Sequence, residues 1–302
     1  MSTISLSLAG LLLLNGVFGL QIPAGYSRTL FEDDFSKLPA GSLPSGNKWN
    51  IVTGTSYPGG PSNWGTNEVE HYTGQTSNLA ITSSGTLRIT PQTDGQGWTS
   101  ARIETINDFA CPAGGKLRIE ASLKFGSASQ AQQMGIWPAF WSMGSDFRGN
   151  YHNWPAVGEI DIAESVNGAS VVYQALHCGT VPGGPCDEYN GLKKISSFTR
   201  GVFHTVAVEI DRTNSGGSWR GESLTWYVDG RQQLTITGSG FSDEWVWTAV
   251  TRNPKYLLLN VAVGGDFPNN AENSGFVTTP TSETRGGEGS SLEVRYVAVW
   301  ST

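Results

Sequence analysis

The stretch Trp154-Pro-Ala-Val-Gly-Glu159-Ile-Asp161-Ile-Ala-Glu164-Ser165 places three carboxylates in an otherwise apolar segment. Because side chains alternate between the two faces of an extended strand, Glu159 and Asp161 share a face and Glu164 falls on the other. One extra residue near Ile162-Ala163, a β-bulge, would return Glu164 to that shared face, and bulges often occur beside active sites. The stretch therefore predicts a bulged strand that presents its three carboxyl groups together.

The bulge also sets the distance between the two outer carboxyl groups. About four backbone steps of ~3.3 Å separate Glu159 from Glu164, and two side chains of ~4 Å reach leave about 5 Å between the carboxyl groups. Carboxyl groups roughly 5–5.5 Å apart are typical of retaining glycosidases, whereas inverting ones hold theirs roughly 6.5–9.5 Å apart. The spacing therefore favours retention of configuration.

Two other interpretations of this segment are an exposed acidic strand and a calcium site. A solvated strand usually alternates Glu with Lys or Thr, but the spacers Ile160 and Ile162 are apolar. Calcium loops carry Asp, Asn and Gly spacers rather than β-branched apolar ones. Both interpretations fit less well than catalysis, and we expect no metal and no cofactor.

The same residues resemble the signature of a known family. Glu159-Ile-Asp161-Ile-Ala-Glu164, preceded by Trp-Pro and a Gly, resembles the bulged signature of glycoside hydrolase family 16, the laminarinase-like enzymes. The resemblance covers most of the chain, from Phe31 to Trp300. It implies that Glu159 is the nucleophile and Glu164 the acid/base, and that Asp161 between them tunes the pair.

Three carboxyl groups this close raise one another's pKa. The cluster of Glu159, Asp161 and Glu164 should therefore hold at least one proton near neutral pH and titrate as a coupled unit. We expect Asp161 to share a hydrogen bond with Glu159.

The resemblance also implies a set of substrate-contacting residues: Asn67, Arg102, Trp137, Trp154 and His177. Asn67 begins a segment similar to the family's Asn-Glu-x-x-Tyr-Tyr, and Arg102 lies in a Ser-Ala-Arg-Ile strand. Trp137 and Trp154 offer flat rings on which the C–H faces of sugars can pack. His177 matches the family's Leu-His position opposite the acid/base.

Several neighbouring residues have a plainer interpretation. We expect Trp141 to be core and His204 to be structural, while Glu68 and Glu70 fit solvated strand charges as well as site residues. The four histidines share no metal-ligand spacing and no Gly-x-Ser-x-Gly accompanies them, which excludes zinc-site and serine-hydrolase interpretations.

Outside the signature, short alternating strands are separated by Gly and Pro turns. Residues 86–90 and 117–125 alternate, residues 256–263 are apolar on both faces, and Asp229-Gly230 is a hairpin signal. Convincing amphipathic helices are absent. The pattern predicts an all-β sandwich of two antiparallel sheets. The resemblance makes this a concanavalin A-like β jelly roll, a single catalytic domain over 20–302, whose concave sheet carries the substrate cleft.

The N-terminal segment has the features of a secretory signal peptide. Residues 1–20 carry no charged side chain, and the run Leu11-Leu-Leu-Leu14 is followed by Val17-Phe-Gly19. This predicts a signal peptide over 1–19 and a secreted, extracellular protein without a membrane anchor. The net charge of −7 argues against a nucleic-acid partner, which needs a basic face, and suits a neutral polysaccharide. We expect a monomer.

Three cysteines agree with export. Cys178 and Cys186 flank a turn-rich segment that can fold back on itself, which predicts a disulfide between them. Cys111 is then left over as a buried, inert thiol.

Two departures from the family pattern affect finer predictions. Arg295 stands where the family often has Asp, so the structural calcium of many relatives is not expected. The Cys178–Cys186 loop follows His177 closely and should reshape the cleft rim, which bears on the identity of the glycan.

The favoured function is an endo-acting, retaining hydrolase of β-1,3-glucan. An endo-1,3-β-galactanase or a transglycosylase of the same family would have the same carboxylates and fold. A non-catalytic lectin on the same sandwich is the alternative from another class. It has no reason to place three carboxylates together at a desolvation cost.

Overall fold

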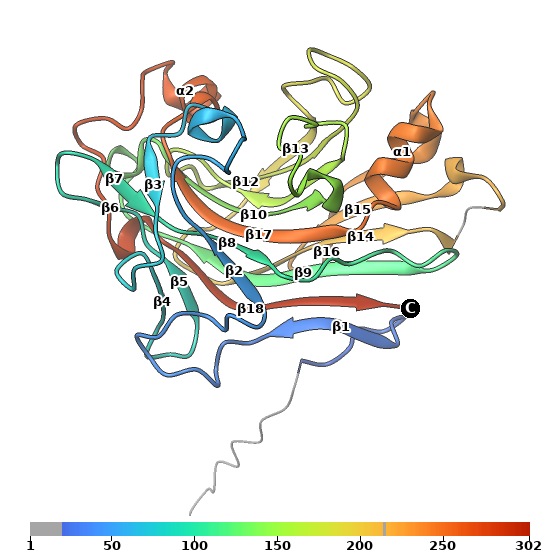
Figure 1. The fold of residues 1–302 in the computed structure, drawn as a ribbon, viewed down its shortest axis with the longest axis horizontal. Helices are drawn as coiled ribbons and strands as arrows, with labels where there is room; N and C mark the ends of the chain where they lie inside the picture. Colours follow the sequence, from blue (N-terminus) through green and yellow to red (C-terminus); the bar gives the residue numbers. More distant parts are fainter. Residues whose placement is uncertain (1–19, 214–215) are drawn as a thin grey trace, which may run out of the picture.

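The computed structural model describes residues 20–213 and 216–302, so the predicted signal peptide lies outside the described residues. Two large antiparallel sheets are stacked face to face, and the sheet that contains β10 and β17 lies above the one that contains β9 and β18 in Figure 1. The sandwich predicted from the alternating pattern is confirmed.

The lower sheet has eight strands in the described part of the chain. They run in the order β16-β15-β14-β9-β18-β5-β4, with β1 also pairing β18. Their bounds are β1 Arg28–Asp33, β4 Leu79–Ile81, β5 Leu87–Ile89, β9 Lys116–Phe125, β14 His204–Asp211, β15 Ser223–Val228, β16 Arg231–Thr237 and β18 Leu292–Ser301.

The upper sheet has seven strands among the described residues, in the order β13-β12-β11-β10-β17-β8-β2. Their bounds are β2 Trp49–Val52, β8 Arg102–Thr105, β10 Ile136–Gly144, β11 Glu159–Glu164, β12 Val171–His177, β13 Leu192–Ser197 and β17 Lys255–Val263. The predicted acidic strand is β11, and it lies inside the sheet with a partner on each side.

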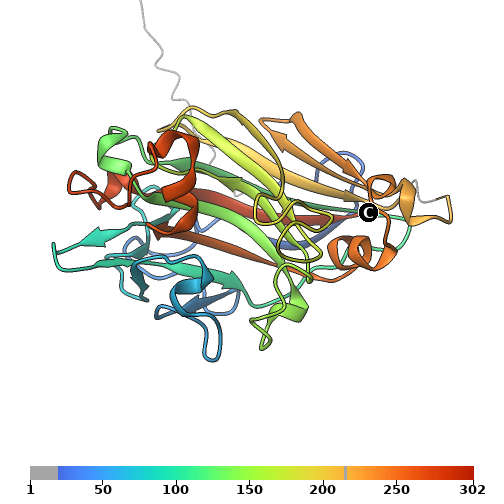
Figure 2. The same cartoon turned by 90° about the horizontal axis from the view of Figure 1, so that it is seen from above.

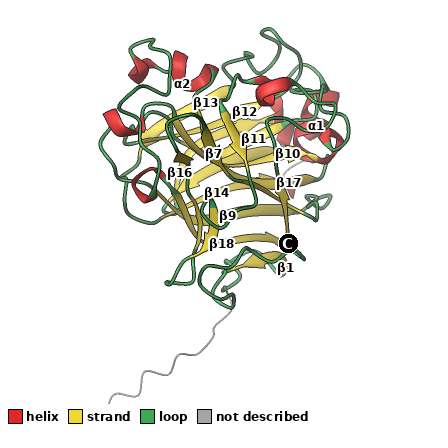
Figure 3. Cartoon of the chain, turned by 60° about the vertical axis from the view of Figure 1, so that its left-hand side comes forward, coloured by secondary structure: helices red, strands yellow, loops and turns green. Residues whose placement is uncertain are grey.

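A small third sheet and two short helices complete the described fold. The sheet consists of β3 Glu70–Tyr72, β6 Gln92–Thr93 and β7 Trp98–Ser100. The helices, α1 Glu244–Thr251 and α2 Asp266–Asn270, lie toward opposite ends of the molecule in Figures 1 and 2. Strands dominate the view in Figure 3. None of the helices described here has the length and apolar character needed to cross a lipid bilayer.

The core fills the space between the sheets. Along β9, Leu117, Ile119, Leu123 and Phe125 are fully buried, as the alternating pattern predicts. Every residue of β17 is buried, which agrees with its two-sided apolar sequence. Full burial of one such side chain contributes about 1.5–3 kcal/mol, so the sandwich is stabilised mainly by this layer.

Helix α1 was not expected from the sequence. It packs Val246, Trp247 and Val250 into the core, but eight residues are too few to show a clear helical period.

Local predictions outside the acidic strand are also confirmed. Asp229 and Gly230 both have positive φ, at 49° and 71°, as a type I′ turn between β15 and β16 requires. Asp229 also holds His204 through a 2.6 Å contact to Nδ1, so this histidine is structural. Cys178 and Cys186 form a disulfide, and Cys111 is free and buried.

Candidate active site

The predicted bulge is present in β11. Asp161 pairs with Trp141 of β10 and Glu164 pairs with Ala139, and the register shifts between these pairs. Trp141 and Ala139 are two residues apart and share a face, so Asp161 and Glu164 share that face too. Ile160 and Ile162 are fully buried in the core. The bulge therefore turns Glu164 toward the outer face without interrupting the apolar packing behind it.

Each glutamate accepts a hydrogen bond from a tryptophan. Nε1 of Trp137 donates to Glu164 at 2.8 Å, and Nε1 of Trp154 donates to Glu159 at 3.1 Å. Both rings are only partly buried and remain within reach of a ligand. The two tryptophans predicted as substrate contacts therefore also orient the carboxyl groups.

Asp161 forms an ion pair with His177 of the neighbouring strand β12. Its Oδ2 atom is 3.3 Å from Nε2 of His177, while Glu159 accepts from Trp154. Single ligand atoms of Glu159, Asp161 and His177 lie within 4.8 Å of one another, and the hydrogen bond between Asp161 and Glu159 stays a prediction. The sequence of β11 alone does not reveal this ion pair, because His177 belongs to β12.

The other ring nitrogen of His177 faces Glu188. Nδ1 is 2.7 Å from Oε2 of Glu188, and the other oxygen of Glu188 accepts from the backbone N–H of Cys178 at 2.8 Å. An imidazole that faces a carboxylate at each nitrogen is doubly protonated, because carboxylates only accept. Sequence reasoning missed Glu188, and its place in a turn-rich loop gave no signal.

Burial and repulsion shift the titration of the cluster. Burial and the nearby charge of Asp161 raise the pKa of Glu159 to about 8 and that of Glu164 well above its usual range. Burial alone would lower the pKa of His177, but Asp161 and Glu188 raise it well above its usual range. The cluster therefore holds at least one carboxyl proton near neutral pH, beside a charged imidazole.

One group of atoms in this site has metal-ligand spacing. Single ligand atoms of Glu159, Asp161 and His177 lie within 4.8 Å of one another. However, both nitrogens of His177 are directed at carboxylates, and a doubly protonated ring has no lone pair for a metal. The contacts fit an ion-pair relay better than a cation site.

Arg102 is buried among aromatic rings. Its side chain lies 4.8–5.2 Å from the ring centres of Tyr57, Trp64 and Trp141, and the residue is only 4% exposed. It also donates to the Tyr57 hydroxyl at 3.1 Å. Arg102 therefore packs against these three rings, and little of its side chain is exposed for contact with a sugar. Trp141, expected in the core, is partly buried and donates to Asn260 at 2.8 Å.

Asn67 contacts Asp266, the first residue of α2. It is exposed, and its amide donates to both carboxylate oxygens of Asp266 at 3.1 Å. A role in sugar binding would require this amide to be shared with Asp266.

Glu68 and Glu70 are not solvated strand charges. They are 6% and 1% exposed, so that interpretation was wrong. Glu68 accepts from the Tyr72 hydroxyl at 2.9 Å, and Glu70 accepts from the backbone N–H of Val263 at 2.7 Å. Burial and the neighbouring Glu68 raise the pKa of Glu70 well above its usual range.

Known proteins share this architecture. A family model described as an XgeA-like, catalytic GH16 domain matches residues 66–233. An endo-1,3-β-glucanase from Streptomyces sioyaensis has a solved structure that is 43% identical, with a TM-score of 0.86. The match covers 94% of this chain and 99% of that one.

Curated relatives match over different shares of their length. Glucan endo-1,3-beta-glucosidase A1 of Niallia circulans is 27% identical over 79% of this chain, which spans 34% of that protein. The glucan endo-1,3-beta-glucosidase of Cryptopygus antarcticus is 27% identical, over 90% of this chain and 91% of its own length. With the family model matching more than half of it, the chain belongs to glycoside hydrolase family 16.

Proposed function

We propose that the chain is a secreted, endo-acting β-1,3-glucanase that retains the configuration of the bond it cleaves. The observation that carries the proposal is the bulged strand β11, which turns Glu159 and Glu164 to one face, each beside a tryptophan N–H. The linkage follows from the names of the relatives, which are endo-1,3-β-glucanases and glucan endo-1,3-β-glucosidases.

In this mechanism Glu159 is the nucleophile. Its carboxylate attacks the anomeric carbon as the bond to the leaving oxygen breaks, and Glu164 gives its proton to that oxygen. The glycosyl ester on Glu159 is then attacked by water, whose proton passes back to Glu164. The two inversions leave the β configuration unchanged. Burial and the charge of Asp161 raise the pKa of both glutamates, so the cluster holds a proton near neutral pH, and the division of roles needs that proton on the acid while the nucleophile has lost its own.

Asp161 couples the two steps through its charge. It raises the pKa of both glutamates, and its own partner is His177. When Glu159 becomes an ester, its negative charge disappears and the pKa of Glu164 falls. The same residue that served as acid can then act as base toward water.

The first experiment compares product release from laminarin, β-1,3-galactan and lichenan with purified protein. We expect internal cleavage of laminarin, with the β-anomer appearing first by proton NMR. Initial α-anomer would refute retention, a preference for galactan would assign a galactanase, and longer oligosaccharides from short donors would assign a transglycosylase. Glycan binding without products would assign a lectin.

Variants of the two glutamates test their roles. Glu159→Gln and Glu164→Gln should each lower turnover on laminarin about 100-fold or more, the scale of general-acid catalysis. Glu209→Gln, the same change on β14 of the other sheet, is the matched control. A glutamine variant of either site residue that kept more than about a tenth of the wild-type rate would overturn its role.

Export is tested separately. The protein recovered from culture medium should begin near Leu20, because the proposed signal ends at Gly19. An intact Met1 on the secreted protein would contradict a cleaved signal peptide.

A further inference from the structure

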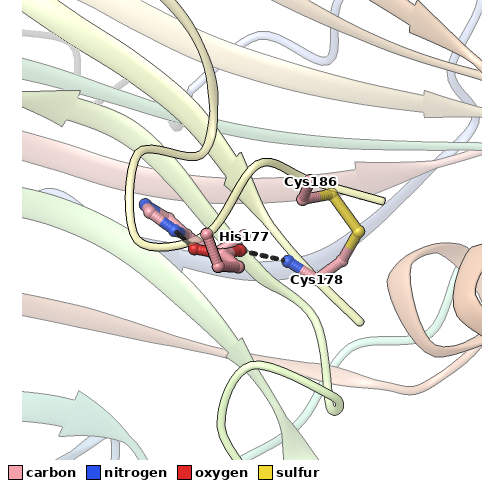
Figure 4. The surroundings of a disulfide bond; sticks show 4 residues. His177, Cys178 and Cys186 are labelled. Atoms are coloured by element: carbon pink, nitrogen blue, oxygen red, sulfur yellow. Dashed lines mark hydrogen bonds and ion pairs between the residues drawn. A yellow bond between two sulfur atoms is a disulfide. The ribbon is translucent and has the colours of Figure 1, made fainter. Parts of the chain in front are cut away.

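The loop after β12, residues 178–191, folds back over His177. Figure 4 shows the Cys178–Cys186 disulfide beside His177, with dashed contacts that lead from the histidine through a carboxylate to the Cys178 backbone. That carboxylate belongs to Glu188, whose side chain is fully buried. Glu188 has no exposed surface for a sugar, so it acts on the site through its contact with His177 and through its charge, which also raises the pKa of Glu159.

We propose that Glu188 is a positioning residue that holds the His177 ring against Asp161. The inference deepens the proposed function and rests on it, because Asp161 matters here through the two glutamates beside it. Neither the acidic stretch nor the family comparison points to Glu188.

The two contacts of Glu188 set the direction in which the His177 ring points. The carboxylate of Glu188 forms two hydrogen bonds, one with Nδ1 of His177 at 2.7 Å and one with the backbone N–H of Cys178 at 2.8 Å. Two contacts to adjacent residues fix the carboxylate relative to the end of β12. The imidazole can then present only Nε2 to β11, where Asp161 lies 3.3 Å away.

The His177 ring lies among several carboxyl groups. His177 faces Asp161 and Glu159 from β11 and Glu188 from the loop, and Glu164 lies farther along β11. On β13, Lys193 pairs with Ala175 but is exposed. The buried positive charge that balances these carboxylates therefore comes from His177, and Glu188 supports it from behind.

Gly191 limits the space around the His177 ring. Gly191 has φ +70°, and a Cβ there would lie 2.8 Å from Cε1 and 2.9 Å from Nε2 of His177. The loop therefore passes so close to the ring that a side chain at this position would displace it. The disulfide anchors the first part of the loop, and Gly191 at the far end of the loop confines the His177 ring.

A second histidine has the same pair of contacts, from a carboxylate that is half exposed. Asp229 contacts Nδ1 of His204 at 2.6 Å and accepts from the N–H of the next residue, Thr205, at 2.9 Å. This pair belongs to the other sheet. Asp229→Asn therefore removes the same kind of support from a histidine outside the site.

The experiment compares Glu188→Gln with Asp229→Asn. Histidine NMR titration should show that His177 loses its proton at lower pH in Glu188→Gln, because one facing carboxylate charge is gone. On laminarin, kcat should fall about 10- to 100-fold, as when a metal-bound histidine loses its orienting carboxylate. KM should stay within about twofold, since Glu188 is buried. Asp229→Asn should leave kcat, KM and the titration of His177 unchanged.

Two further variants keep the result decisive. Glu188→Asp, which restores the charge on a shorter side chain, should recover part of the His177 titration. Gly191→Ala should lower kcat while leaving Glu188 in place. This variant tests the position of the His177 ring if Glu188→Gln does not fold. An unchanged His177 titration, or an unchanged kcat, in Glu188→Gln would overturn the proposal. If the wild type cleaves no glycan, the proposed function is wrong. The His177 titration in Glu188→Gln still tests whether Glu188 positions the ring.

Discussion

The two tryptophan–glutamate hydrogen bonds make a prediction about opposite limbs of the pH profile. Trp137→Phe removes the N–H that donates to Glu164, and Trp154→Phe removes the one that donates to Glu159. Each N–H stabilises the ionised carboxylate, so its loss raises the pKa of that carboxyl group. The first change acts on the proposed acid and the second on the proposed nucleophile.

The size of the effect follows from the strength of the bond. A hydrogen bond to a charged group contributes about 1.5–3 kcal/mol, and one pH unit corresponds to about 1.4 kcal/mol. We therefore expect a limb to move by about one to two pH units. Trp137→Phe should move the alkaline limb upward, because Glu164 keeps its proton longer. Trp154→Phe should move the acidic limb upward, because Glu159 ionises later.

The assay is kcat/KM on laminarin as a function of pH, which reports the groups of the free enzyme. Trp245→Phe on α1 is the matched control, because this tryptophan is 54% exposed. Both substitutions moving the same limb, or neither moving one, would refute the separate roles of the two glutamates.

Three more predictions concern single features of the structure. Asp161→Asn should lower turnover and move both limbs to lower pH, because its charge raises the pKa of both glutamates, and an unmoved profile would contradict this. The double variant Cys178→Ala/Cys186→Ala should lower the free energy of unfolding by about 2–3 kcal/mol, measured by denaturant titration, and should also lower kcat. Loss of the folded sandwich in this variant would contradict a role confined to the loop. The raised pKa of Glu70 means that its protonated form stabilises the fold below its unfolded-state pKa, and this contribution is lost as pH rises. Glu70→Gln should thus leave Tm unchanged near about pH 4 and raise it near about pH 9, and a lower Tm at the higher pH would count against a strained carboxylate pair.

Local geometry made much of the fold predictable. A strand has a side-chain period of two, so alternation along β9, the two-sided burial of β17 and the bulge in β11 are all readable from the residues concerned. The Asp229-Gly230 turn and the Cys178–Cys186 bridge are equally local.

The contacts that tune the site depend on chain segments far apart or on loop paths. Glu188 reaches His177 only because the disulfide loop folds back over the end of β12. Glu68 and Glu70 look like strand charges until the small sheet packs them beside Tyr72 and Val263. Burial raises the pKa of Glu70, and no local sequence pattern encodes that burial.

The sequence by itself therefore determined the sandwich and the three carboxylates on one bulged strand, since these follow from backbone periodicity. Tertiary structure decided which donor each carboxylate meets: Trp154 for Glu159, Trp137 for Glu164, and His177 for Asp161. The reason is that periodicity fixes the face toward which a side chain points, whereas its partner depends on which strands and loops the fold places around that face.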